Sequence, residues 1–444
     1  MTFGQPDDPA GDFFGQVMGS MMKFIGTSLS PQDPTDITKS IAVSIATEGK
    51  TESNVDPELR ISMERIFKIA GIYLADMEVI DQPGADRLIE PVERGAWAIQ
   101  TASDWRYLNQ YDSKQNDNEP TPDTEQHTAT NVPIDIDNID SSTSSTLSPE
   151  EEKTLAKLEA SLANSTDPFN HIADNMTDYM SQDPKSLMSA WSKIIGPTIS
   201  AMQLGASIGA LSQHELGQYG LLIPRVGSSK IMVIPRNMEI FAKDWSLGTD
   251  EVWLWVSLRE ILAHNVLSRP HVANKLISLL STISAQVAQA TMDAMQQVGD
   301  MLATGETDYF EQLMSDPLSL MNEPTSSQYG PAEAEIKTLN ALITGYLDYE
   351  LSVSVDRLFG GKTNIVEAWH RYQINEINQE RGILGIDPDP DGEDRGKRFI
   401  SGILERESDN ILDLIWKNED TLPTVAELDA PGLWLERLRI EGLL

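Results

Sequence analysis

The 444-residue sequence contains no cysteine. This absence excludes disulfide bonds, thiolate metal ligands and a cysteine nucleophile. Basic residues are also scarce, because 33 Lys and Arg stand against 69 Asp and Glu and give a formal charge of −36. A chain with this charge repels the phosphates of nucleic acids and the surface of anionic membranes. We therefore expect neither a nucleic-acid nor a membrane partner.

Long apolar runs are missing as well. No uncharged stretch is both long and apolar enough to span a bilayer, which predicts that the chain has no transmembrane helix. The first residues carry acid where a secretory signal peptide needs positive charge. Together with the lack of cysteine, these features predict a cytoplasmic protein. Hydrophobic residues make up 40% of the chain, which is enough for one large or two smaller cores.

Changes in composition divide the chain into four segments. Residues 1–35 are rich in Gly, Met, Pro and Asp and are predicted to form a disordered tail. Residues 36–103 are predicted to be a helical region that packs on the core. Residues 104–149 are predicted to be an acidic disordered linker, since 112–149 hold eight acidic residues, one lysine and no aromatic residue. Residues 150–444 are predicted to form the main domain.

Helix signals dominate outside the linker. Asp56-Pro57-Glu58 predicts a helix start, with Asp as the cap and Pro at the first helical position. Apolar residues then recur at helical spacing at Ile61, Ile66, Ile69, Ile72 and Tyr73. Thr249 is predicted to cap another helix. Further helices are expected at about 271–302, 332–358, 363–382, 394–406 and 409–418.

One segment has a different period. "GLLIPRVGSSKIMVIP" holds two apolar runs on either side of Gly227-Ser228-Ser229. Such a pattern predicts a β-hairpin, placed here at residues 220–235. The predicted fold class is therefore mainly α with a small β-hairpin element.

The segment 252–267 is apolar on every face of a helix, yet it contains Arg259, Glu260 and His264. A helix that is apolar all round is a buried helix. Buried charges need partners, so these residues belong either to an ion-pair network that fixes the fold or to a functional site.

Two places in the chain approach the zinc-binding pattern HExxH. In that pattern, two histidines four residues apart share one helix face and bind zinc, and the glutamate deprotonates the zinc-bound water. "HELGQ" has Gln218 in the position of the second histidine. "REILA" keeps only Glu260, because Arg259 cannot bind a cation and Ala263 has no donor atom.

The order of motifs around this helix resembles a known family. "GLLIPRVGSSKIMVIPRNMEIFAKDWSLGTDEVWLWVSLRE" is similar to the central block of the actinobacterial zincin-like hydrolases, often labelled zinc-dependent metalloproteases. A sister branch is associated by name with deazaflavin-coenzyme biosynthesis. "LITGYLDYELSVSVDRL" resembles the family's EGxxxHV helix, with Gly345 as the shared glycine, and "TLPTVAELDAPGLWLERL" resembles its LPTxxDLxDP segment. The resemblance covers 36–103 and 150–435. The motif residues of the central block are Pro235, Asn237, Asp250, Glu251, Val252, Arg259 and Glu260.

The resemblance implies a zincin-like helical fold, but this chain departs from the family at the zinc ligands. The first two ligand positions are Arg259 and Ala263 here. The third falls on Tyr349, or on Tyr346 one turn earlier. Since none of these residues is histidine, we expect no metal and no cofactor at these positions.

Zinc is expected only if the ligands have been rearranged. Glu260 and His264 are four residues apart and share a helix face, and His271 would join them if the helix continued past Pro270. Asp348 is a further candidate oxygen ligand or ion-pair partner. His370 is expected at the surface of a polar helix.

Three functions therefore stay open. The first is a non-catalytic binding or scaffold protein, in which Arg259 supplies a permanent positive charge held by Glu260 and Asp348. Such a protein could hold a protein or peptide partner by strand addition at the hairpin. The second is an active metallohydrolase with rearranged ligands, with Glu260 as general base and His264 as ligand. The third is a structural subunit of a complex. The sequence does not define the oligomeric state.

Overall fold

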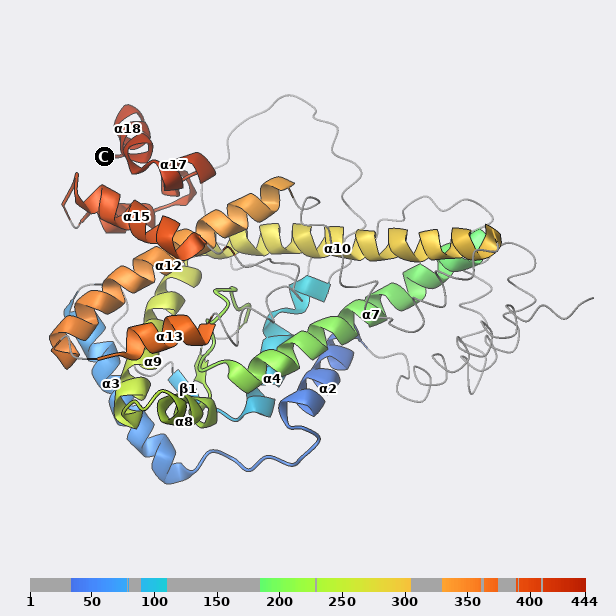
Figure 1. Ribbon diagram of the computed structural model, residues 1–444, viewed down its shortest axis with the longest axis horizontal. Helices are drawn as coiled ribbons and strands as arrows, with labels where there is room; N and C mark the ends of the chain where they lie inside the picture. Colours follow the sequence, from blue (N-terminus) through green and yellow to red (C-terminus); the bar gives the residue numbers. More distant parts are fainter. Residues whose placement is uncertain are drawn as a thin grey trace, which may run out of the picture. The chain divides into compact units, whose positions relative to one another are not determined.

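The computed structural model describes residues 33–77, 79, 89–109, 184–227, 230–304, 330–360, 363–373, 389, 391–408 and 410–444. These residues are mostly helical, with two short strands (Figure 1). The prediction of a mainly α fold with a small β element is therefore confirmed. The predicted N-terminal tail lies almost entirely outside the described residues, and so does most of the predicted linker.

The chain forms two compact units, one of which contains residues 32–109, 197–290 and 322–444 and carries the candidate site. The described part of the other unit is helical, formed by residues 184–196 and 291–304. The elements are α2 (Pro34–Ala46), α3 (Pro57–Asp76), β1 (Ile89–Pro91), α4 (Arg94–Asp104), η2 (Arg106–Asn109), α7 (Pro184–His214), β2 (Ile231–Val233), α8 (Pro235–Asp244), α9 (Thr249–Leu267), α10 (Pro270–Thr304), α12 (Gly330–Phe359), α13 (Ile365–Tyr372), α15 (Gly392–Leu404), α16 (Ile411–Ile415), η7 (Glu419–Thr421), α17 (Val425–Asp429) and α18 (Pro431–Ile440).

Helix α3 begins as predicted but buries a different face. Asp56 caps it by accepting a hydrogen bond from the backbone N–H of Glu58 at 2.8 Å. The helix packs against α9, and its buried residues are Met63, Phe67, Ala70, Gly71 and Leu74. Of the residues at helical spacing, Ile66 and Tyr73 pack against the core, whereas Ile61, Ile69 and Ile72 are more than half exposed.

The two strands pair in parallel, and this corrects the predicted hairpin. Ile89 lies opposite Ile231 and Pro91 opposite Val233. The first run of the predicted hairpin forms no strand, because the chain turns at Leu222, which has a φ of 54° and donates its N–H to the Tyr219 carbonyl. The partner of β2 therefore comes from a distant part of the sequence.

Side chains and a loop cover part of both edges of this small sheet, where strand addition was expected. On the free side of β2, the N–H of Met232 donates to Gln218 Oε1 at 2.9 Å and that of Ile234 to the Leu216 carbonyl at 2.9 Å. On the free side of β1, Pro91 has no N–H, and its carbonyl accepts a hydrogen bond from Arg60 Nη2 at 3.2 Å. These contacts leave fewer unpaired backbone groups for an extended peptide.

Helices α12 and α15 cross at close range through two glycines (Figure 1). A Cβ on Gly345 would lie 2.3 Å from the backbone carbon of Gly396, and a Cβ on Gly396 would lie 1.9 Å from the Ala341 carbonyl oxygen. No other residue fits at either position without separating the helices. The glycine shared with the EGxxxHV-like segment thus serves this helix crossing.

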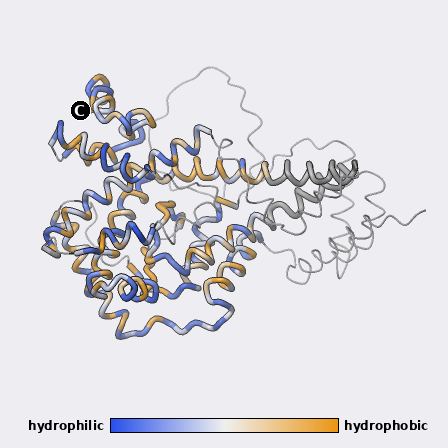
Figure 2. Tube along the Cα trace, viewed as in Figure 1, coloured by the Kyte–Doolittle hydropathy of each residue, from blue (hydrophilic) through white to orange (hydrophobic). Residues whose placement is uncertain are grey.

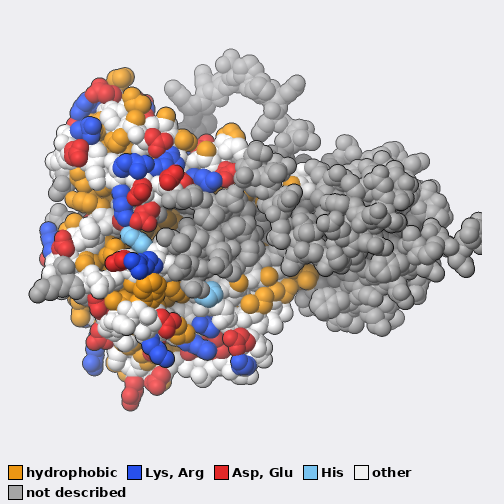
Figure 3. Space-filling view, in the orientation of Figure 1, with side chains coloured by type: hydrophobic (Ala, Val, Ile, Leu, Met, Phe, Trp, Pro, Cys, Tyr) orange, Lys and Arg blue, Asp and Glu red, His pale blue; other side chains and the backbone are white. Residues whose placement is uncertain are grey.

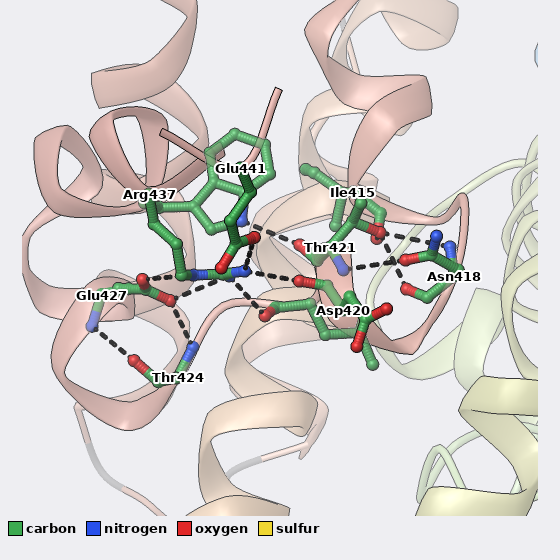
Figure 4. Close-up of polar contacts among 10 residues, drawn as sticks. Ile415, Asn418, Asp420, Thr421, Thr424, Glu427, Arg437 and Glu441 are labelled. Carbon is green, nitrogen blue, oxygen red and sulfur yellow. Dashed lines mark hydrogen bonds and ion pairs between the residues drawn. The ribbon is translucent and has the colours of Figure 1, made fainter. Parts of the chain in front are cut away.

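The LPTxxDLxDP-like segment forms a polar clamp at the C-terminus (Figure 4). Arg437 Nε donates to Glu427 Oε1 at 2.7 Å, and the other carboxylate oxygen accepts the N–H of Thr424 at 2.9 Å. Trp434 Nε1 donates to the Thr421 carbonyl at 2.8 Å. Since α17 and α18 also contact α15, this clamp holds the C-terminal helices on the α12–α15 pair.

Helix α9 lies inside the core, as the apolar pattern predicts. Its buried residues occupy all faces. Hydrophobic and hydrophilic residues alternate along most of the helices (Figure 2). The predicted cap, Thr249, is instead the first residue of the helix, and Gly248 is the capping residue. The N–H of Gly248 donates to Glu251 Oε2 at 3.3 Å.

On the face of the molecule in Figure 3, acidic and basic side chains are interspersed. Within the described ranges, every helix is too short or too polar to cross a lipid bilayer.

Candidate functional site

A buried ion pair forms the centre of the candidate site on α9. Arg259 is 5% exposed and Glu260 is 1% exposed. Arg259 Nη1 donates to Glu260 Oε1 at 3.0 Å. The face of the guanidinium lies over the Trp369 ring on α13, with 4.6 Å between the guanidinium carbon and the ring centroid. Such a contact stabilises a desolvated cation.

The loop that follows α7 closes around this pair. The backbone N–H groups of Gln218 and Tyr219 both donate to Glu260 Oε2, at 2.7 and 2.9 Å. The Tyr219 carbonyl accepts Arg259 Nη1 and Nη2, each at 3.2 Å. Both carboxylate oxygens of Glu260 and both terminal nitrogens of Arg259 are therefore bonded to protein groups.

Asn237, from the motif that resembles the family's P-x-N, holds the end of α7 and hence this loop. Its Nδ2 donates to the carbonyls of Ser212 and Glu215, at 3.0 and 2.6 Å. These carbonyls lie at the C-terminal end of α7, where they have no partner within the helix. Arg94 Nε in turn donates to Asn237 Oδ1 at 2.8 Å, which fixes the amide orientation. The motif thus positions the backbone at the end of α7.

Burial governs the charge state of the pair. It raises the pKa of the Glu260 carboxyl above its ordinary value, although Arg259 and the two N–H donors oppose this rise. An acid with a raised pKa resembles the general bases of hydrolases. However, a base must also reach water or substrate, and both oxygens of Glu260 are bonded within the protein.

A second buried arginine on the other side of the loop was not anticipated from the sequence. Arg225 Nη1 lies 3.5 Å from Asp104 Oδ2, and its Nη2 donates to the Gln218 carbonyl at 3.1 Å. Its guanidinium lies between the rings of Trp97 and Trp105, at 5.1 and 5.0 Å. Burial lowers the pKa of Arg225 and raises that of Asp104. Two guanidinium groups therefore hold the carbonyls of one short loop.

The ligand-equivalent positions do not form a zinc site. Ala263 is fully buried and, like Arg259, has no donor for zinc. Tyr346 packs edge-on against Trp416, with ring centroids 5.3 Å apart, and Tyr349 packs against the core. The residues present therefore do not fit a zinc ion bound in the manner of HExxH.

The residues of the rearranged ligand set have other partners or lie on another helix. His264 Nδ1 lies 2.8 Å from the Tyr219 hydroxyl, and a neutral ring accepts the hydroxyl proton there. Burial lowers the pKa of His264, which favours this neutral form. His271 belongs to the next helix, since α9 ends at Leu267 and Pro270 begins α10.

Asp348 lies in another cluster. Its Oδ2 is 3.3 Å from Lys397 Nζ and 3.6 Å from His370 Nε2, whereas the ion-pair partner of Arg259 is Glu260. His370 also approaches Glu393, with 3.3 Å between Nδ1 and Oε1. His370, expected at the surface, is partly buried, with its side chain 22% exposed.

A pocket of about 500 Å³ opens beside α8. Its lining includes Arg94, His214, Asn237, Trp245 and Tyr372. The Tyr372 hydroxyl donates to the His214 carbonyl at 2.6 Å. His214 is the last residue of α7, so His214 and Gln218 of "HELGQ" do not share a helix face.

Replacing Gly217 by alanine is expected to destabilise the protein by about 1–3 kcal/mol. A Cβ at this position would lie 2.4 Å from Glu260 Cδ. The carboxylate cannot retreat without losing two backbone hydrogen bonds. The measurement is the free energy of unfolding in urea.

Gly432→Ala is the matched control, because nothing lies within 4 Å of a Cβ there. The change in its free energy of unfolding should not exceed about 1 kcal/mol, the usual difference between glycine and alanine in a helix. If both variants unfolded at the same urea concentration as the wild type, the tight contact between the loop and Glu260 would be disproved.

Comparisons with known proteins agree with the motif order. The family model described as zincin-like metallopeptidase matches residues 35–435. Among curated proteins, none matches this chain. A matching solved structure is titled "Crystal structure of a putative hydrolase with a novel fold from Chloroflexus aurantiacus". It is 13% identical and has a TM-score of 0.47, and the alignment covers 91% of this chain and 98% of that chain.

The likeness to the solved structure is too weak to carry an argument about function. The family match, in contrast, spans most of the chain and includes α9, the loop after α7 and α17. The chain belongs to the zincin-like metallopeptidase family.

Proposed function

We propose that this chain is a non-catalytic member of its family, in which the guanidinium of Arg259 permanently supplies the positive charge that a zinc ion supplies in a catalytic relative. In this role the protein binds a partner or ligand rather than hydrolysing it. The position of Arg259 at the first ligand place of the degenerate motif supports the proposal.

One observation carries it. Glu260 accepts two backbone N–H groups on one oxygen and Arg259 on the other, and it is 1% exposed. A general base in a zincin must accept a proton from a zinc-bound water. Here the same carboxylate joins α9 to the loop after α7, so its bonding is that of a structural acid.

The alternative, a hydrolase with rearranged ligands, has less support. It needs His264 to bind a metal beside Glu260, but His264 Nδ1 faces the Tyr219 hydroxyl. It also uses Asp348, whose ion pairs are made with Lys397 and His370. Neither residue is a partner of Glu260 in the hydrogen bonds that the structure gives.

A binding role has a suitable place beside α8. The pocket there, at about 500 Å³, lies within the range of ligand sites. It combines apolar walls from Ile240 and Trp245 with polar groups from Gln213, His214 and Asn237. A small molecule or a single side chain of a partner protein would fit such a lining.

Peptidase assays of the full chain test the proposal. We expect the wild type and Glu260→Gln to leave an unfolded protein substrate and a random peptide library uncleaved, with or without added zinc. Glu333→Gln, at another buried glutamate that pairs with Lys337, is the matched control. Zinc-dependent cleavage by the wild type and by Glu333→Gln, but not by Glu260→Gln, would establish catalysis and disprove the proposal.

A further inference from the structure

We propose that Asp348, His370 and Glu393 form a binding site for a divalent transition metal, and that Lys397 occupies this site in the metal-free protein. The three side chains come from α12, α13 and α15. One donor atom from each lies within 4.8 Å of the others. The site is separate from the ligand positions on α9.

The geometry suits a small ion. Zinc binds histidine nitrogen and carboxylate oxygen at about 2.0–2.2 Å, which separates tetrahedral ligands by about 3.4 Å. His370 Nε2 and Asp348 Oδ2 are 3.6 Å apart, close to that separation. Glu393 Oε1 now lies 3.3 Å from the other ring nitrogen, Nδ1, so its carboxylate, which is 36% exposed, must turn toward Nε2 to become the third ligand.

Two of these donor atoms have no hydrogen bond at present. Asp348 Oδ2 and His370 Nε2 are buried and neither makes a hydrogen bond, although Asp348 Oδ2 forms an ion pair with Lys397 Nζ at 3.3 Å. Buried polar atoms are normally bonded, and an exception calls for an unseen ion or water or for a functional reason. A metal ion between these two atoms would satisfy both of them at once.

The backbone around the site is fixed by packing. Asp348 lies one turn after Gly345, and Lys397 follows Gly396, so the close contact of these two glycines positions α12 against α15. His370 follows Trp369, which is 4% exposed and packs against Trp255 with ring centroids 5.2 Å apart. Little conformational entropy would be lost on binding, because the donors project from packed helices.

Lys397 is the present cation of the site. Its Nζ is 3.3 Å from Asp348 Oδ2 and contacts Glu393 Oε1. A lysine that shares two carboxylates competes directly with a metal ion for them. Its side chain is 40% exposed, so the ammonium can move into water when a metal arrives.

The donor set defines the class of ion. One imidazole and two carboxylates without a thiolate suit zinc and its neighbours among the divalent transition metals. Calcium, in contrast, prefers six to eight oxygen ligands. We therefore expect zinc to bind and calcium not to displace it.

Competition with a chromophoric zinc chelator, on the full chain stripped of metal, tests the site. Lys397→Met should bind zinc at least about tenfold more tightly than the wild type, since the competing charge is gone. His370→Ala and Glu393→Gln should each bind at least about tenfold more weakly. Glu393→Gln changes a partly exposed side chain, so it serves if His370→Ala proves unstable.

Lys337→Met is the matched control, because Lys337 makes the same four-residue ion pair with Glu333 outside the cluster. Its zinc affinity should equal that of the wild type. Equal affinities in all variants would indicate adventitious binding, and no binding by either the wild type or Lys397→Met would show that no site exists. Either result would overturn the inference. None of these outcomes bears on Arg259 and Glu260, so the proposed function is tested independently.

Discussion

Arg259→Met should reduce the free energy of unfolding by about 3–5 kcal/mol, the usual cost of leaving a buried charge without its partner. Methionine keeps most of the volume beside Trp369 but removes the cation. Glu260 would then be a buried carboxylate with two backbone donors and no positive charge within hydrogen-bonding distance. Urea unfolding at several pH values is the measurement.

The loss should grow as the pH rises. Burial already raises the pKa of Glu260, and removing Arg259 raises it further, because Arg259 is the largest influence that lowers it. A carboxyl whose folded-state pKa is raised contributes stability below its unfolded pKa and loses it as the pH rises through the folded pKa. Arg259→Met should therefore be closest to the wild type near pH 5 and furthest from it near pH 8.

Glu260→Gln in the same chain should rescue part of the loss. The double variant is expected to be more stable than the sum of the single changes by about 2 kcal/mol, since no buried charge then remains unpaired. Arg371→Met is the control, because Arg371 makes an exposed pair with Glu367 that is worth about 0.3–0.5 kcal/mol. Additive effects of Arg259→Met and Glu260→Gln would show that the two residues do not act as a pair.

Local sequence signals predicted the helices of this fold better than they predicted which elements contact each other. The Asp56-Pro57 start of α3 and the all-apolar pattern of α9 were both read correctly, because caps and helical periodicity depend on neighbouring residues. The hairpin was wrong because β2 pairs with residues 89–91, about 140 positions earlier in the chain. The spacing of the isoleucines also did not give the buried face of α3, which is formed by Met63, Phe67, Ala70, Gly71 and Leu74.

The candidate site shows the same division. Arg259 and Glu260 stood out because charges in an apolar helix need partners. Their backbone partners could not be found from sequence, because the N–H groups of Gln218 and Tyr219 carry no side-chain signature. Arg225 was missed for a related reason, as its partner Asp104 lies in a distant part of the sequence.

Arg259→His together with Ala263→His should create a zinc site on α9. The double change restores HExxH, with two imidazoles four residues apart on one face of α9 and Glu260 between them. Removing the guanidinium also frees the space that the cation occupies. The imidazole at position 263 must fit in a fully buried place, so a stability loss of about 1–3 kcal/mol is expected alongside the gain of zinc.

Zinc content measured by elemental analysis, on untagged protein purified without chelator, tests the central claim most directly. The comparison is made in a His370→Ala background, which removes the histidine ligand from the separate cluster on α12, α13 and α15. We predict no zinc in the His370→Ala chain and about one zinc ion per chain once Arg259→His and Ala263→His are added. Stoichiometric zinc in the His370→Ala chain, or a folded triple variant that binds none, would contradict the claim that Arg259 stands in the place of the metal.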